Sequence, residues 1–331
     1  MEPSRSARDD LGVVVIGRNE GERLRRCLES LRSATGRIVY VDSGSTDDSV
    51  ETSRRLQVSV EELDLARPFT AARARNAGFR RLLELHPQTK QVFFVDGDCE
   101  VAQGWLEKST QFLAARPDLA VVCGRRRERY PDRSIYNMLC DIEWDTPLGE
   151  ARACGGDALM RVSAIQQVHG YREDLICGEE PELCVRLRQA GWRIWRLDAE
   201  MTLHDAGLYR FSQWWKRTLR GGYAFAMGAA IHGAPPERHW VAESRRAWLW
   251  GLGIPVGIVG LAAGLGGAFL GLLVVYPLQT IRLAARGRRT SRENWWQAVA
   301  LVLGKFPEML GELKFLLDRV RRVRSQLIEY K

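Results

Sequence analysis

Short apolar runs alternate with amphipathic segments through the first hundred residues, and this alternation restricts the fold more than any other feature of the sequence. Residues 11–16, 37–41 and 92–95 are rich in β-branched and aromatic side chains, which are typical of buried strands, and residues 58–63 form a shorter candidate strand. The intervening segments, including residues 70–85, are predicted helices. Strands that alternate with helices predict βαβ crossovers and a mostly parallel sheet.

Polar residues come directly after three of these predicted strands. They are Gly17, Asn19 and Glu20 after the first strand, Asp42 and Ser43 after the second, and Asp96 and Asp98 after the last. Ligands of open α/β sheets bind at the carboxyl ends of the strands, so we expect these residues to line one site. No G-x-G-x-x-G follows the first strand, which argues against a dinucleotide cofactor.

The Asp96-Gly97-Asp98 turn has the chemistry of a cation site. Two carboxylates at i and i+2 point the same way from an extended backbone, and Gly97 lets the chain turn and an anion approach it. Such a pair is half of a site for Mg²⁺ or Mn²⁺, with positions open for phosphate oxygens. The alternative is a plain polar turn. The other motifs of the chain favour the cation site.

The cysteines and the N-terminus indicate the compartment. There are 7 cysteines, and no two of them form a C-x-x-C pair. This pattern argues against a disulfide framework and a zinc site, and for a reducing environment. Residues 1–10 are charged and polar, so we expect a disordered N-terminus without a secretory signal, and a catalytic part in the cytosol.

Residues 104–204 add three further features. A basic cluster covers residues 125–129, and Gly155 and Gly156 form a glycine pair. The cluster is predicted to be a solvated face, with an acceptor pyrophosphate site as the alternative. A helix is predicted after Gly178, with Glu180 at its N-cap and Pro181 at its first helical position.

The order of these motifs resembles glycosyltransferase family 2, the inverting nucleotide-sugar enzymes with a GT-A fold. The resemblance covers residues 11–233 and rests on five motifs: VVIGRNE, VDSGSTD, ARNAG, VDGD and GEEPELCVRLRQAGW. It implies an α/β, Rossmann-like GT-A domain over residues 11–233 that binds a nucleotide sugar.

The resemblance also implies roles for single residues. The residues implied to bind the donor nucleotide are Gly17, Asn19, Glu20, Asp42, Ser43, Arg75, Asn76 and Asp96. Asp96 and Asp98 resemble the metal-binding Asp-x-Asp of the family, and His204 matches a histidine that completes the metal site, so Mg²⁺ or Mn²⁺ is the implied cofactor. Trp214, Trp215 and Arg217 match a segment that holds acceptor and diphosphate. An interfacial membrane helix explains these three residues equally well.

The catalytic Glu-Asp pair of the family is replaced here by Glu179 and Glu180. Sugar transfer needs a general base for the acceptor hydroxyl. Adjacent carboxylates raise each other's pKa and a helix N-terminus lowers it, so one glutamate can be an ionised base near neutral pH. Glu180 is the predicted base and Glu179 the second candidate. Arg18 and Ser43 depart from the family pattern and leave the nucleotide open: a UDP-sugar is favoured, and GDP- and dTDP-sugars are the alternatives.

A long uncharged stretch predicts a membrane anchor. Residues 247–281 are 35 residues without a charged side chain. One such helix would be about 52 Å long, against about 30 Å for a bilayer core, so we predict a hairpin with a glycine-rich turn at residues 262–267. Arginines flank both ends, which places both ends in the cytosol. The alternative is a buried helical pair in a larger core.

The charge of the chain is concentrated after this hairpin. Residues 282–331 hold 12 Lys and Arg against 5 Asp and Glu, within a chain of net charge +8. Residues 295–323 are predicted to form an amphipathic helix on the membrane surface. Residues 234–331 are therefore predicted to be a helical, membrane-associated region.

Together these features predict an inverting, metal-dependent transferase at the inner membrane, with its catalytic domain in the cytoplasm. The expected acceptor is a lipid-linked saccharide of exopolysaccharide or cell-surface glycan synthesis, and no nucleic-acid partner is expected. One alternative is a polyprenyl-phosphate sugar synthase, which would need no strong base. The other is a catalytically silent membrane scaffold that binds nucleotide or nucleic acid.

Overall fold

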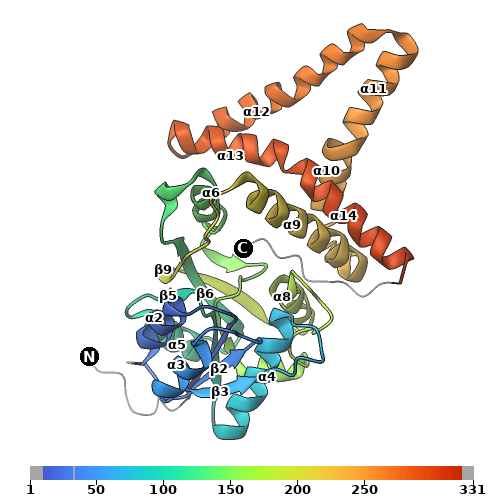
Figure 1. Ribbon diagram of the computed structural model, residues 1–331. Coiled ribbons are helices and arrows are strands. Elements are labelled where there is room, and N and C mark those ends of the chain that lie inside the picture. Colours follow the sequence, from blue (N-terminus) through green and yellow to red (C-terminus); the bar gives the residue numbers. More distant parts are fainter. Residues whose placement is uncertain (1–9, 33, 323–331) are drawn as a thin grey trace. The chain divides into compact units, whose positions relative to one another are not determined.

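The computed structural model describes residues 10–32 and 34–322, and its chain divides into two compact units (Figure 1). The first unit comprises Met1–Arg129 and Glu143–Ala206. The second comprises Tyr130–Ile142 and Gly207–Lys331. Residues 1–9 of the predicted disordered N-terminus lie outside the described residues.

The first unit is an α/β domain built on one mixed sheet. Its strands are β1 (Leu11–Gly17), β2 (Ile38–Asp42), β3 (Ser59–Glu62), β4 (Gln91–Asp96), β5 (Cys99–Val101), β6 (Leu119–Glu128), β7 (Gly149–Ala151), β8 (Ala158–Arg161) and β9 (Arg193–His204). Its helices are α2 (Glu22–Leu31), α3 (Ser49–Arg55), α4 (Ala71–Leu85), α5 (Trp105–Ala115), α7 (Val162–Gln167) and α8 (Glu179–Gln189).

The strand order is β3-β2-β1-β4-β8-β6-β9-β5, with β7 paired to β9. The first four strands in this order are parallel, as the alternation predicts. Beyond β4 the expectation of a mostly parallel sheet is wrong, because β8 runs antiparallel to both β4 and β6, and β5 and β7 run antiparallel to β9. Strand β7 pairs with β9, and β8 enters the sheet between β4 and β6.

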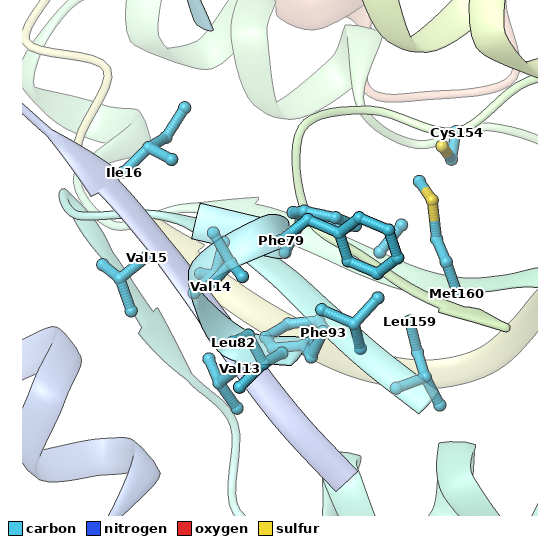
Figure 2. Packing of buried hydrophobic residues seen from close by; sticks show 14 of the residues in the cluster. Val13, Val14, Val15, Ile16, Phe79, Leu82, Phe93, Cys154, Leu159 and Met160 are labelled. Carbon is cyan, nitrogen blue, oxygen red and sulfur yellow. The ribbon is translucent and has the colours of Figure 1, made fainter. Parts of the chain in front are cut away.

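The core lies where helices cover the sheet on both faces. Val13, Val14 and Val15 of β1 are fully buried. Both faces of this strand are therefore covered, which explains why its apolar residues are consecutive and do not alternate with polar ones. Figure 2 shows Phe79 and Leu82 of α4 beside β1 and Phe93 of β4. This packing holds α4 against β1 and β4.

A glycine sets the distance between α4 and the sheet. A Cβ added to Gly78 would lie 2.4 Å from Val14 and 2.7 Å from Val41. Only glycine therefore lets the helix approach β1 and β2 so closely. Arg75 and Asn76 lie one turn earlier on the same helix, so the close approach also carries them toward the end of the sheet.

The second unit is helical. Its helices are α6 (Ile135–Glu143), α9 (Phe211–His232), α10 (Val241–Trp248), α11 (Ile254–Leu265), α12 (Val275–Arg286), α13 (Ser291–Leu303) and α14 (Lys305–Val320). Helices α9 and α14 pack backbone to backbone, since a Cβ on Gly222 or Gly311 would overlap the main chain of the other helix. Where one helix was predicted over residues 295–323, the structure has α13 and α14, separated at Gly304; residue 323 lies outside the described residues.

Two helical stretches of this unit are long and apolar enough to cross a bilayer. They are Val241–Leu265, with 25 residues, and Gly267–Arg286, with 20. They meet at Gly266, inside the predicted turn, and Figure 1 shows α11 and α12 as two arms joined at this point. Large apolar side chains are more than half exposed on both arms, for example Val259 and Leu265 on the first and Val274 and Leu278 on the second.

Candidate active site

Arg75 is the centre of the site. Its guanidinium is 2% exposed and lies 2.9 Å from Asp96 Oδ1, 2.9 Å from Glu179 Oε1 and 2.8 Å from Glu180 Oε1. Three carboxylates from α8 and the end of β4 therefore converge on one planar cation, which suits bidentate recognition of carboxylates. The sequence places Arg75 and Asp96 at the donor and the two glutamates at the reaction. The structure brings these two groups together.

The two glutamates lie in the first turn of α8. The helix begins at Glu179, and its N-cap is Gly178 in the left-handed region at φ 74°. The prediction that Glu180 caps the helix is therefore wrong, because glycine adopts this backbone conformation without steric cost. Burial, and then repulsion from Glu179, raise the pKa of Glu180 to about 7, while Arg75 acts in the opposite direction. The Glu180 side chain is 13% exposed.

Asp96 is held from its other side by Arg126. Arg126 Nη2 lies 3.2 Å from Asp96 Oδ2 and 2.7 Å from Asp157 Oδ1, and Arg126 is on β6 within the basic cluster. Arg125 is 8% exposed. Of the three consecutive residues Arg125, Arg126 and Arg127, only Arg127 is well exposed, at 45%. The predicted solvated face is therefore wrong for Arg125 and Arg126, because β6 lies inside the sheet. Arg125 pairs with Asp145, and Arg126 pairs with the fully buried Asp157.

Asp98 and His204 form a second cluster beside the first. Asp98 Oδ1 lies 3.2 Å from His204 Nε2, and both residues are buried. The ring centroid of Trp144 lies 4.9 Å from that of His204, edge-on, and 5.5 Å from the guanidinium of Arg126, so this ring contacts one residue of each cluster.

This second cluster fits a divalent cation. Donor atoms of Asp98, Cys99 and His204 lie within 4.8 Å of one another. Burial raises the pKa of the Cys99 thiol well above its usual value, so Cys99 stays protonated and is a poor ligand for a hard cation. Carboxylate and imidazole then remain as the donor set for a divalent cation.

The loops after β1 and β2 are joined to each other through Asn19. The side-chain oxygen of Asn19 accepts a hydrogen bond from the main-chain amide of Thr46 at 2.7 Å. The main-chain amide of Asn19 donates to Ser45 Oγ at 2.9 Å. Asn19 has a positive φ of 56°, which asparagine tolerates better than most residues. The Ser43 amide donates to the Gly17 carbonyl at 3.0 Å. Glu20 forms an ion pair with Arg23 at 2.8 Å.

Asp42 and Asn76 are both engaged by the protein itself. Asp42 accepts from Tyr40 Oη at 2.9 Å and from the amides of Gly44 and Ser45 at 2.9 and 2.8 Å. Asn76 accepts from the Tyr171 amide at 2.9 Å and donates to the Tyr171 carbonyl at 2.8 Å. Both side chains hold loops at the edge of the sheet. Their contact with a donor nucleotide stays a prediction.

The three predicted acceptor residues lie on α9, in the second unit. Trp214 is 7% exposed and stacks on Tyr136 at 6.3 Å. Trp215 lies 5.5 Å from Phe211, which is 48% exposed. Arg217 follows on the same helix. These aromatic rings form a cluster at the start of α9, and its role stays a prediction.

Sequence reasoning missed Asp157, Arg126 and Thr202. Asp157 is fully buried and comes directly after the glycine pair, and Thr202 lies on β9. The signal that could have found Asp157 is an acidic residue that follows Gly155 and Gly156 and precedes an apolar run. The basic cluster at residues 125–129 includes Arg126 but does not reveal its role, because the partners of Arg126 lie 30 and 31 residues away along the chain.

Residues 12–166 match the family model described as glycosyl transferase family 2. The pre-mycofactocin glycosyltransferase of Mycobacterium tuberculosis is 28% identical over 219 residues, which are 61% of this chain and 44% of that protein. The succinoglycan biosynthesis protein ExoA of Rhizobium meliloti is 26% identical over 205 residues, 56% of this chain and 60% of that protein. The chain thus spans less than two thirds of the length of either relative.

A solved structure supports the fold over nearly the whole chain. The mannosyltransferase PcManGT from Pyrobaculum calidifontis, solved in complex with GDP-Man and Mn²⁺, superposes with a TM-score of 0.63 at 18% identity. The match covers 94% of this chain and 88% of that one. The predicted GT-A fold is confirmed.

Proposed function

We propose that this chain, whose residues 12–166 match the model of glycosyl transferase family 2, transfers a sugar, with inversion, from a nucleotide-diphosphate sugar to a lipid-linked saccharide. The observation that carries the proposal is the convergence of Asp96, Glu179 and Glu180 on Arg75, at 2.8 to 2.9 Å. A donor-side carboxylate and two candidate bases then share one rigid centre. Sugar transfer needs this proximity of the donor to the group that activates the acceptor.

On the donor side, the proposed metal ligands are Asp98 and His204, with Asp96 adjacent. A divalent cation held there would stabilise the charge that develops on the departing diphosphate. The relative solved with Mn²⁺ supports a cation of this class. The loops joined by Asn19 and Asp42 lie at the carboxyl ends of β1 and β2, where an α/β sheet binds nucleotides.

On the acceptor side, Glu180 is the proposed general base. Its raised pKa, about 7, makes it a strong enough base to take a proton from a hydroxyl and leaves a large fraction ionised near neutral pH. Arg75 fixes the direction of the carboxylate. Glu179 contacts the same guanidinium and raises the proton affinity of its neighbour.

The acceptor class is inferred from the helical unit. Two apolar helical stretches of membrane-spanning length support an anchor in a bilayer, where the acceptor would be held by its lipid. Relatives that act in surface-polysaccharide synthesis, such as ExoA, support a saccharide acceptor. We place the enzyme at the inner membrane with the first unit in the cytoplasm.

The first experiment measures binding of UDP, GDP and dTDP to the intact protein by calorimetry, with and without Mn²⁺. We expect one nucleotide to bind in a Mn²⁺-dependent manner, and D98N to lose this dependence. Asp198, an exposed residue on β9, provides the matched control D198N, which should bind as the wild type does. Weak binding of every nucleotide, indifferent to Mn²⁺, would favour a scaffold instead of an enzyme.

A further inference from the structure

A buried network of Asp157, Arg126 and Thr202 lies behind the candidate site. Asp157 is completely buried and receives four contacts: Arg126 Nε at 2.9 Å, Arg126 Nη2 at 2.7 Å, Thr202 Oγ1 at 2.6 Å and the Asp96 amide at 3.2 Å. Two oxygens with four partners leave this carboxylate saturated. Asp157 therefore has little capacity left for a ligand, and its task lies within the protein.

The network ends on the Asp96 carboxylate. Arg126 Nη2 contacts Asp96 Oδ2 at 3.2 Å, whereas Arg75 contacts Asp96 Oδ1 at 2.9 Å. Each oxygen of Asp96 thus has its own arginine, and Asp157 also binds the Asp96 main chain. Carboxylates of binding sites need such second contacts to hold their direction.

The contacts come from strands that meet only in the folded sheet. Asp157 immediately precedes β8, Arg126 lies on β6 and Thr202 on β9, while Asp96 ends β4. Because β4, β8, β6 and β9 are neighbours in the sheet, the network spans four adjacent strands at one edge.

We propose that Asp157 and Arg126, with Thr202, are positioning residues that fix the Asp96 carboxylate for cation and donor binding. The proposal rests on the proposed function, in which Asp96 belongs to the donor and metal site. It assigns a role to Arg126, which belongs to the basic cluster, and to Asp157, which follows the glycine pair. Among the described contacts, neither residue touches the glutamates of α8.

The test measures Mn²⁺ binding to the full-length protein without nucleotide. The electron paramagnetic resonance signal of the free ion reports how much Mn²⁺ stays unbound. R126K keeps the positive charge but loses the planar fork that reaches Asp157 and Asp96 together. We expect R126K to weaken Mn²⁺ binding about 10- to 100-fold, as loss of an outer contact to a metal ligand does. The matched control is R127K on the same strand, where Arg127 is 45% exposed and pairs with Glu200, and it should bind Mn²⁺ normally.

A double-mutant cycle with D96N separates positioning from a general structural effect. Asp98 and His204 remain in D96N, so weakened Mn²⁺ binding can still be measured. If Arg126 acts through Asp96, adding R126K to D96N changes the Kd no further. An equal loss in both backgrounds, or no loss in R126K alone, overturns the proposal.

A second variant covers the case in which R126K does not fold. T202V removes one contact to Asp157 without changing any charge, and the same cycle with D96N applies to it. Wild-type protein that binds neither Mn²⁺ nor nucleotide would instead refute the proposed function. Wild-type protein that binds both, with an additive cycle, would refute only the positioning role.

Discussion

At the scale of single residues, Glu180 and Glu179 share a helix turn and a guanidinium but should differ in function. We expect E180Q to lower kcat about 10²- to 10⁴-fold, because an amide cannot accept the proton of the acceptor hydroxyl. Nucleotide binding should stay unchanged, since the donor loops are not altered. Steady-state kinetics together with calorimetry measure both effects.

The matched control is E179Q, which keeps the proposed base and should lose less activity than E180Q. Equal losses in the two variants would contradict the assignment of Glu180. A wild-type rate in E180Q would indicate a phosphate acceptor, which is nucleophilic without a base.

The raised pKa of Glu180 also sets the expected pH dependence. The carboxyl group is a base only when ionised, and its pKa is raised from 4.5 to about 7. We therefore expect kcat/KM, which reports groups of the free enzyme, to rise with pH, to reach half its maximum near pH 7, and to level off above it. Below the midpoint kcat/KM should fall about tenfold per pH unit, as for one titrating group.

Glu179 offers a check on the cause of this profile. Repulsion from Glu179 contributes to the raised pKa of Glu180, so E179Q should move the midpoint toward lower pH. A midpoint that stays in place would show that the profile belongs to another group.

At the scale of elements, the loop between β7 and β8 carries a glycine pair in which the two positions should behave differently. A Cβ on Gly156 would lie 2.7 Å from Arg75 Nη2 and 2.8 Å from Asp96 Oδ2. We expect G156A to displace this ion pair, to lower activity at least tenfold, and to destabilise the fold by about 1–3 kcal/mol, as overpacking does.

Gly155 supplies the control for this prediction. Among the described residues, no atom lies within 4 Å of a Cβ added there. G155A should therefore keep both activity and thermal stability, measured by the sugar-transfer rate and by the melting temperature. Comparable losses in G155A and G156A would mean that the loop itself, and not the Arg75 contact, is sensitive.

At the scale of the whole molecule, the helical unit should decide where the protein resides. Val259 lies on α11 and is 58% exposed. An arginine near the centre of a membrane span costs about 2.5–3.5 kcal/mol, so V259R should reduce the share of protein that stays with membranes after alkaline washing. Leu148 of the first unit is 54% exposed and gives the control L148R. Equal retention of V259R and wild type would contradict a spanning hairpin.

Much of this architecture could be predicted because it depends on local patterns. The first four strands, the helix at Ala71–Leu85 and the turn at Gly266 agree with the expectations from periodicity, turn residues and charge. The resemblance to glycosyltransferase family 2 could also be predicted, since its motifs occur in a fixed order along the chain, and the family model matches residues 12–166. These features need only neighbouring residues, whose spacing shows which side chains share a face of a helix or strand.

The tertiary structure alone decided the rest. It buried Arg125, paired Arg126 with the buried Asp157, placed β8 antiparallel between β4 and β6, and brought Asp157 to the amide of Asp96, 61 residues away. It also partly buried Glu180 and brought Arg75 and Asp96 beside it, and these act on its proton affinity together with the adjacent Glu179. Strand pairing and burial arise from contacts between distant segments, and the periodicity of one segment carries no record of its partner. The sequence therefore determined the kind of chemistry at the sheet edge, and the fold decided which charges meet there.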